Sequence, residues 1–230
     1  MYGCLGFGSS RFFCQAIAAL ITRTGRETLL KTKDLAETKL GFNVVYGDTD
    51  SIMINTGTQN LKDSLEMGKK LKVEVNVLYK CLEIEIDGVF KSLLLLKKKK
   101  YAALKVEDFL GEGKHIVTEL KGLDMVRRDW CPLSKRVGNK VLEEILSGKE
   151  REKIISVLND FFNDISHQMK NNGINVAEYI ITKQLTKAPQ DYSDYKSLPH
   201  VAVALRQKSK GKSDTELVGN FIPFVICINT

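Results

Sequence analysis

The stretch FNVVYGDTDSIMIN, residues 42–55, decides the fold, because two apolar, β-branched runs flank a short polar turn in it. Before the turn the apolar residues Phe42, Val44 and Tyr46 stand at every second position, and isoleucines recur at every second position after it, which is typical of half-buried strands. Gly47-Asp48-Thr49-Asp50 supplies residue types that tight turns prefer. The stretch therefore predicts a β-hairpin with Asp48 and Asp50 at its tip.

Asp48 and Asp50 are candidate metal ligands. Residues two apart on an extended chain share a face. Two carboxylates on one edge repel unless a cation lies between them, and Mg²⁺ prefers such oxygen ligands. The alternative is that Asp, Thr and Gly only form the turn. An EF-hand loop is excluded, because Met53 stands where that loop needs glycine and Gln59 where it needs glutamate.

Composition limits the classes of protein that this chain can represent. Its 230 residues, 43% hydrophobic and 27% charged, allow one or two soluble domains with cores. The net charge of +7 favours a polyanionic partner where the basic residues cluster. The five cysteines form no C-x-x-C pair, so neither a zinc ribbon nor a disulfide framework is indicated, and a reducing compartment fits. No apolar run approaches the roughly 20 residues that span a bilayer.

A basic run precedes an apolar stretch at KKKKYAAL, residues 97–104. We expect a continuous strand here, with Lys97, Lys99 and Tyr101 on one face and Lys98 and Lys100 on the other. Such a row of ammonium groups with an aromatic ring suits a phosphate backbone. The alternatives are a nuclear-localisation run or a lysine-protected sheet edge.

Four stretches together resemble family B DNA polymerases. YGDTDS resembles the metal-binding hairpin of that family, and Met1-Tyr2-Gly3 matches the end of its N-S-x-Y-G string on the fingers helix. KKKKY resembles the K-K-R-Y motif that grips the primer end, with Lys100 in place of arginine. KGLDMVRRDW, residues 121–130, resembles the junction of palm and thumb. The resemblance covers essentially the whole chain and is strongest to the replicative alpha type, which extends primase-made primers.

The resemblance implies roles for further residues. Tyr2 and Gly3 would lie in the nucleotide site, beside the nascent base pair; the alternative for Tyr2 is a buried aromatic at a helix end. Lys98, Lys99, Lys100, Tyr101 and Lys121 would bind DNA. The sequence starts inside a motif, so we expect it to be cut from a longer chain.

Two arginines of the junction, Arg127 and Arg128, are candidates for holding primer phosphates. The alternative is that one of them only pairs with Asp124 or Asp129. At Lys100, where the K-K-R-Y motif has arginine, lysine keeps the charge but lacks the planar fork of guanidinium.

Leu82, Ile84 and Ile86 alternate with acids and predict a half-buried strand. If that strand pairs beside the hairpin, Glu85 or Asp87 approaches the metal; the alternative is an acidic edge strand.

Helical spacing predicts the remaining elements. These are a helix capped by Ser9 or Ser10 over 12–21, an interruption at Gly25, a continuation over 28–40, and helices over 61–79, 134–148 and 154–172.

The predicted fold class is α/β (α+β), an antiparallel polymerase palm sheet backed by helices. The palm covers 1–122, with the end of the fingers helix at 1–8, and a mostly helical thumb covers 123–230. The resemblance implies a DNA-directed DNA polymerase, a nucleotidyltransferase whose two Mg²⁺ ions clamp the primer 3′-hydroxyl and the incoming triphosphate. Asp50 would be the direct ligand and Asp48 a supporting charge.

The resemblance also implies partners and a compartment. We expect primed DNA with an RNA-DNA primer, deoxynucleoside triphosphates, primase and accessory polymerase subunits, in the nucleus. The family's upstream palm carboxylate and triphosphate-gripping fingers residues are absent from this sequence, so we expect half a catalytic site that is inactive alone. The competing functions are a non-catalytic nucleic-acid-binding module and a structural partner in replication.

Overall fold

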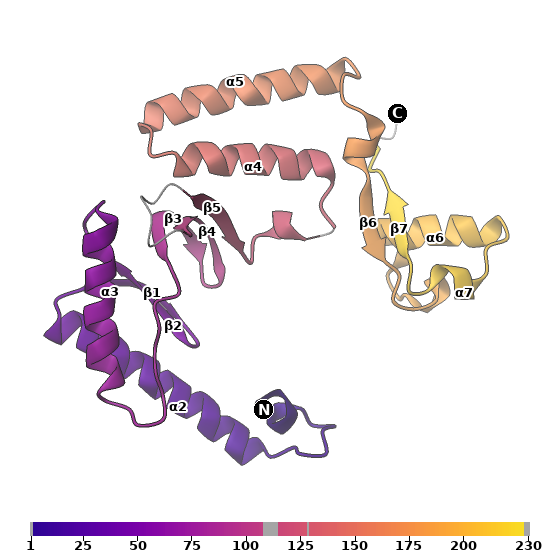
Figure 1. Ribbon diagram of the computed structural model, residues 1–230. Coiled ribbons are helices and arrows are strands. Elements are labelled where there is room, and N and C mark those ends of the chain that lie inside the picture. The colour runs from indigo at the N-terminus through magenta and orange to yellow at the C-terminus, as the bar shows by residue number, and fades with distance from the viewer. Residues whose placement is uncertain (1, 108–114, 128, 228–230) are drawn as a thin grey trace. The chain divides into compact units, whose positions relative to one another are not determined.

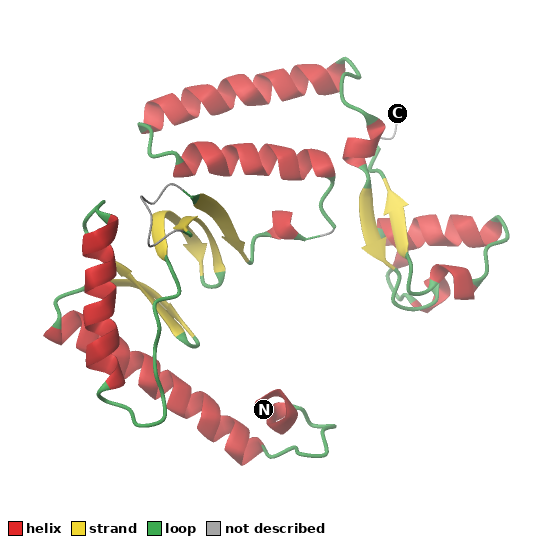
Figure 2. Ribbon diagram, in the orientation of Figure 1, coloured by secondary structure: helices red, strands yellow, loops and turns green. Residues whose placement is uncertain are grey.

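The computed structural model describes residues 2–107, 115–127 and 129–227 as a mixture of helices and short strands (Figure 1, Figure 2). In chain order the helices and strands are α1 (Tyr2–Gly6), α2 (Gln15–Asp34), β1 (Asn43–Asp48), β2 (Ser51–Asn55), α3 (Leu61–Asn76), β3 (Val89–Lys97), β4 (Lys100–Val106), β5 (Ile116–Lys121), α4 (Pro132–Leu146), α5 (Arg151–Lys170), β6 (Ile181–Gln184), α6 (Pro199–Ser209), α7 (Asp214–Leu217) and β7 (Phe221–Phe224). In the described residues these strands form three sheets, β1-β2, β3-β4-β5 and β6-β7. The mixed α/β class is confirmed.

The chain divides into two compact units. One comprises residues 1–91 and 104–118, and the other comprises residues 92–103 and 119–230. The assignment of 1–122 as palm and 123–230 as thumb stays a prediction. No helix among the described residues is long and apolar enough to cross a bilayer.

The predicted hairpin is confirmed. Strands β1 and β2 pair antiparallel, and Asp48 at the end of β1 lies opposite Ser51 at the start of β2. Thr49 and Asp50 form the turn, and Thr49 has a φ of 47°. The left-handed backbone at Thr49 lets two residues reverse the chain.

Helices back this hairpin as predicted. Ala36, Leu71 and Val75 form a buried cluster, which contacts apolar side chains of both strands. Ala36 lies in the π-helical turn Leu35–Lys39 that continues α2, and the other two residues lie on α3. Removal of these side chains from water supplies the main stabilisation of the hairpin. The packed strand residues are Val44, Ile52 and Ile54.

Helix α2 differs from the prediction at both places where it was expected to start or break. It runs unbroken through Gly25, because a single glycine costs a helix only about 1 kcal/mol relative to alanine. It begins at Gln15, and Cys14 is its N-cap. Ser10 instead closes a preceding turn, accepting a hydrogen bond from the Phe12 amide at 3.2 Å.

The strand predicted over 82–86 is wrong, because this segment has no strand partner among the described residues. The side chain of Asn76, at the end of α3, takes the place of a neighbouring strand. Its Oδ1 accepts from the Ile84 amide at 2.8 Å, and its Nδ2 donates to the Ile84 carbonyl at 3.3 Å. Glu85 pairs with Lys72 of α3 at 2.7 Å. The segment therefore does not pair beside the hairpin, which was the condition for Glu85 or Asp87 to approach a metal there.

The helices predicted in the second half of the chain are confirmed as α4 and α5, which run antiparallel (Figure 1). Leu133 and Ile165 pack with Ile174 in the core of this pair. After them β6 pairs antiparallel with β7, and a separate core forms beside α6. Leu185, Val201 and Leu217 are buried in that core.

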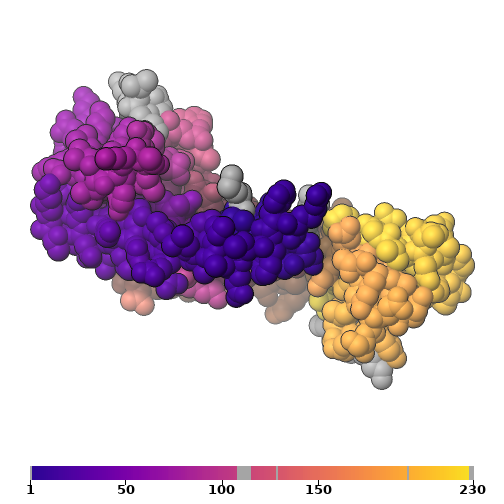
Figure 3. Space-filling model, turned by 90° about the horizontal axis from the view of Figure 1, so that it is seen from below, coloured from indigo at the N-terminus to yellow at the C-terminus, as the bar shows by residue number. Residues whose placement is uncertain are grey.

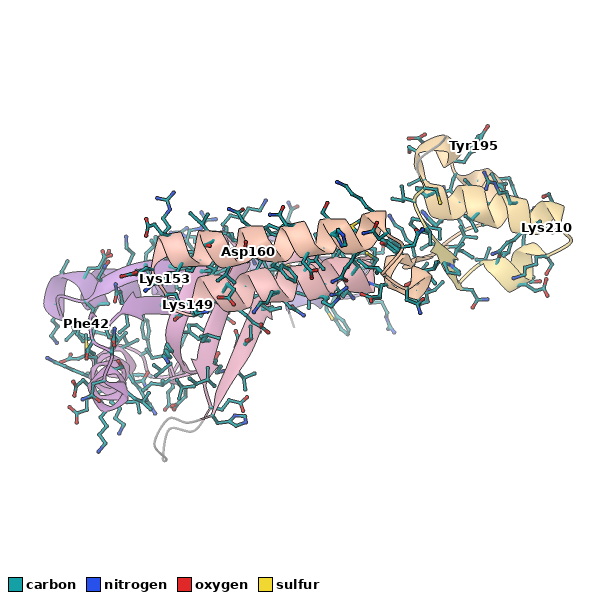
Figure 4. The ribbon with its side chains drawn as sticks, turned by 90° about the horizontal axis from the view of Figure 1, so that it is seen from above. Phe42, Lys149, Lys153, Asp160, Tyr195 and Lys210 are labelled. Carbon is teal, nitrogen blue, oxygen red and sulfur yellow. The ribbon has the colours of Figure 1, made fainter. Side chains whose placement is uncertain are left out.

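A buried carboxylate links the end of α4 to the segment before α5. The side chain of Glu144 is 7% exposed, and its two oxygens contact Lys140 Nζ at 2.8 Å and Lys149 Nζ at 2.7 Å. Lys149 lies in the short connection between the two helices (Figure 4). The hydrogen bonds from Lys140 and then Lys149 lower the pKa of Glu144.

Removing this carboxylate should destabilise the protein in a pH-dependent way. The pKa of Glu144 is lower in the folded state than in the unfolded state, so its contribution is fully present above the unfolded pKa. It is lost as the pH falls through the folded pKa. We expect Glu144→Gln to lower the melting temperature at pH 7 and to lower it much less near pH 3. Thermal unfolding by circular dichroism checks this.

The exposed neighbour Glu143 provides a matched control, since Glu143→Gln changes the net charge equally on the same helix. Its effect should be small at both pH values. An equal loss for Glu144→Gln at pH 7 and pH 3 would show that the two lysine contacts do not stabilise the ionised form.

Candidate functional site

Hydroxyl groups of the hairpin orient the Asp48 carboxylate. Tyr46 Oη donates to one Asp48 oxygen at 3.2 Å, and Thr49 Oγ1 donates to the other at 3.2 Å. Ser51 Oγ donates to the Asp48 carbonyl at 3.3 Å. Asp48 is half-buried at the end of β1. This carboxylate is therefore held in one orientation by the turn itself.

Asp50 is the second turn residue, and it is exposed. The shared-face argument from strand alternation does not hold, because the strand ends before Thr49. Asp48 and Asp50 lie near each other because they flank Thr49 in a tight turn, and not because they share one face of a strand.

The donors at this turn suit magnesium in kind. Carboxylates and hydroxyls offer only oxygen atoms, which Mg²⁺ prefers, and Mg²⁺ commonly uses one or two carboxylates together with water and substrate phosphates. In the described part of the chain no group of three or more Asp, Glu, His or Cys residues gathers at one place. Asp48 and Asp50 therefore fit part of a magnesium site.

The basic run forms a turn, so the prediction of one continuous strand is wrong. Strand β3 ends at Lys97, Lys98 and Lys99 make a two-residue turn, and β4 begins at Lys100. Lys99 has a φ of 63°, a backbone conformation that is uncommon for residues other than glycine. The hairpin places Lys97, Lys98 and Lys99 in an exposed position.

Lys100 and Arg127 share one carboxylate. Lys100 Nζ lies 3.2 Å from both oxygens of Asp124, and Arg127 Nε lies 3.7 Å from one of them. The ion pair with Asp124, which was the alternative to phosphate contact, is therefore observed for Arg127. Arg128 lies outside the described residues.

Tyr101 and Lys121 share a second carboxylate, which the sequence did not single out. Tyr101 Oη donates to Glu119 at 2.8 Å, and Lys121 Nζ lies 3.8 Å from the same oxygen. Glu119 and Lys121 lie two apart on β5 and so share a face. That spacing is the sequence signal that would have pointed to Glu119.

The loop after β5 packs directly on the lysine turn. Gly122 has a φ of 62°, and a Cβ built on it would lie 2.0 Å from the carbonyl oxygen of Lys99. This close approach brings the two segments together, and their five cationic residues are here called the basic cluster. Its members are Lys98, Lys99, Lys100, Lys121 and Arg127.

Arg127 also lines an open depression of about 390 Å³. Lys183 of β6 adds a second cation, and Phe221 of β7 adds an aromatic side chain. Thr182 and Gln184 supply polar groups there. The resemblance assigns these residues only to the predicted thumb, and it is the fold that brings them to Arg127.

Tyr2 lies on α1 and is 51% exposed, so the alternative of a buried aromatic is wrong. Its Cζ lies 3.6 Å from a Cβ built on Gly6, while nothing lies within 4 Å of such a position at Gly3. The indigo amino-terminal residues form open surface in Figure 3. A nucleotide-binding role for Tyr2 and Gly3 stays a prediction.

The acidic turn and the basic cluster each match, in sequence, a motif of a known family. The family model described as DNA polymerase family B matches residues 1–230. The chain belongs to DNA polymerase family B. The resemblance drawn from the four sequence stretches is thereby confirmed.

Relatives of this family B chain carry the name "DNA polymerase alpha catalytic subunit". The protein of that name from Sterkiella nova is 70% identical over 100% of this chain and 16% of its own length. The one from Xenopus laevis is 52% identical over 99% of this chain and 15% of its own length. The chain thus spans about a sixth of the curated relatives that it matches.

A solved structure shares the fold. The family B DNA polymerase of the hyperthermophilic archaeon Pyrobaculum calidifontis superimposes with a TM-score of 0.68 and 26% sequence identity. The match covers 100% of this family B chain and 27% of the archaeal one. The fold class predicted from sequence is confirmed, and the roles of individual site residues remain predictions.

Proposed function

We propose that this chain is the part of a DNA-directed DNA polymerase that supplies Asp48 and Asp50 to the metal site and the basic cluster to the primer-template. One observation carries the proposal: the YGDTDS sequence forms a hairpin tip whose Asp48 carboxylate is held by two hydroxyl groups. Membership of family B supports the same reaction class.

Each acid has its own role in the proposed reaction. Asp50, exposed at the turn, would be the direct magnesium ligand. Asp48 would act as a fixed supporting charge, because the Tyr46 and Thr49 hydroxyls hold its two oxygens. Bound Mg²⁺ would activate the primer 3′-hydroxyl and stabilise charge on the transferred phosphoryl group.

The basic cluster would hold the nucleic acid through its backbone. Lysine and arginine side chains neutralise phosphates irrespective of sequence, and they supply most non-specific affinity. Tyr101, whose hydroxyl bonds Glu119, belongs to the same surface, and Tyr2 and Gly3 would serve the nucleotide. The substrates would be primed DNA with an RNA-DNA primer and deoxynucleoside triphosphates. Primase and accessory polymerase subunits would be partners, in the nucleus.

A binding and extension experiment tests the proposal. The purified 230-residue chain should bind a primed duplex with a dissociation constant of roughly 10⁻⁴ to 10⁻⁶ M at physiological salt, since the basic cluster is present. It should add no nucleotide with Mg²⁺ and all four deoxynucleotides, because two acids alone do not fix two metal ions and a triphosphate. Fluorescence anisotropy and a primer-extension gel are the measurements.

Each outcome separates the alternatives. Absence of binding would overturn the proposed function. A template-dependent ladder would show that this chain contains a complete site. Binding that is unaffected by Mg²⁺, together with no metal-binding heat, would favour a non-catalytic nucleic-acid-binding module.

A further inference from the structure

Asp124 stands between two cations of the basic cluster that come from different segments. Lys100 begins β4, Arg127 follows the 3₁₀ turn Asp124–Val126, and both reach the same carboxylate. The exposed fraction rises from 28% for the Lys100 side chain to 47% for Asp124 and 67% for Arg127. The carboxylate is therefore open to solvent while it holds both partners.

The backbone fixes the position of Asp124. Gly122, two residues earlier, packs against the Lys99 carbonyl, and the Arg127 amide donates to the Asp124 carbonyl at 2.9 Å. The backbone of Asp124 is therefore held beside the lysine turn.

We propose that Asp124 is a positioning residue that holds Lys100 and Arg127 side by side and limits their non-specific grip on phosphate. This inference rests on the proposed function, since it concerns how the same surface meets nucleic acid. One carboxylate offsets one of the two positive charges, so the pair offers DNA a net charge of about one unit. DNA phosphate has to compete with Asp124 for both cations.

Phosphate can compete effectively with Asp124 for Lys100 and Arg127. Exposed ion pairs contribute little net stability, because water screens both charges. A phosphate oxygen can accept charged hydrogen bonds from Lys100, as the carboxylate does, and from Arg127, which only forms an ion pair with the carboxylate at 3.7 Å. Asp124 therefore weakens binding without blocking it, and such weakening would suit a protein that has to move along its template.

The charge-neutral variant Asp124→Asn should bind DNA more tightly and with a steeper salt dependence. One more counterion is released when both cations neutralise phosphates, so the slope of log K against log salt should steepen by about one unit. At 0.1 M NaCl we expect affinity for a primed duplex to rise roughly five- to tenfold. Fluorescence anisotropy across 50–200 mM NaCl measures both quantities.

Two further variants separate the specific effect from a change in net charge. Asp160→Asn removes one negative charge from an exposed position on α5 (Figure 4), and its slope should equal that of the wild type. Asp124→Glu keeps the charge and should restore the wild-type slope. Asp124→Ser, measured beside Asp124→Asn, guards against a folding defect of one variant.

The outcomes distinguish this inference from the proposed function. If the wild-type chain does not bind the duplex, the proposed function fails and the inference falls with it. If the wild type binds but Asp124→Asn and Asp160→Asn share its slope, only the inference is overturned. A shallower slope for Asp124→Asn would likewise overturn it, since Asp124 would then assist phosphate binding.

Discussion

Replacing Asp50 with alanine in a full-length polymerase that carries this segment is expected to reduce primer extension by roughly a thousandfold, with DNA affinity nearly unchanged. Metal ions contribute several kcal/mol of transition-state stabilisation in phosphoryl transfer, and about 4 kcal/mol corresponds to that factor. DNA affinity depends on the basic cluster instead. Single-turnover extension and anisotropy on the same primed duplex measure the two effects separately.

Asp63→Ala is the matched control for this experiment. Asp63 is an exposed acid in the first turn of α3, so its removal changes net charge equally outside the acidic turn. It should extend primers at the wild-type rate. A similar loss in both variants would indicate a general charge effect.

Metal binding can be examined without activity. Mg²⁺ or Mn²⁺ should bind weakly to the 230-residue chain, and the double variant Asp48→Asn, Asp50→Asn should bind less. Calorimetry that gives equal heats for the two proteins would remove the metal-site assignment.

The acidic hairpin could be predicted because its signals are local. Alternation over residues 42–55 defines the strands, and Gly, Asp and Thr define the turn. The apolar periodicity of α3, α4 and α5 is likewise contained in each segment. These elements form where the sequence places them because nothing distant competes with their local preferences.

The lysine turn could not be predicted, because Lys98-Lys99 contains none of the residues that mark a tight turn. Distant contacts favour the turn: Gly122 packs on the Lys99 carbonyl, and Asp124 pairs with Lys100. Both contacts come from residues more than twenty positions later. The local pattern therefore predicts one continuous strand where the folded chain forms a hairpin.

The strand predicted over 82–86 was wrong for a related reason. Alternation correctly indicates an extended chain, but it does not identify what satisfies the backbone. Here the amide side chain of Asn76 bonds the Ile84 backbone, and Lys72 pairs with Glu85. A helix, and not a neighbouring strand, supplies these partners.

Gly122→Ala should destabilise the protein by roughly 2–4 kcal/mol. A side chain at a φ of 62° costs about 1 kcal/mol, and the added Cβ would lie 2.0 Å from the Lys99 carbonyl oxygen. Two backbone segments have to separate, which carries the cost of overpacking, roughly 1–3 kcal/mol. Urea unfolding followed by circular dichroism measures the loss.

The control for this last experiment is Gly148→Ala, because Gly148 has a φ of 75° and nothing lies within 4 Å of its Cβ position. It isolates the backbone cost, so it should destabilise by only about 1 kcal/mol. Equal losses for the two variants would show that the loop after β5 does not press on the lysine turn. A larger loss of stability for Gly122→Ala, together with weaker DNA binding in a buffer without denaturant, would mean that this contact holds the basic cluster together.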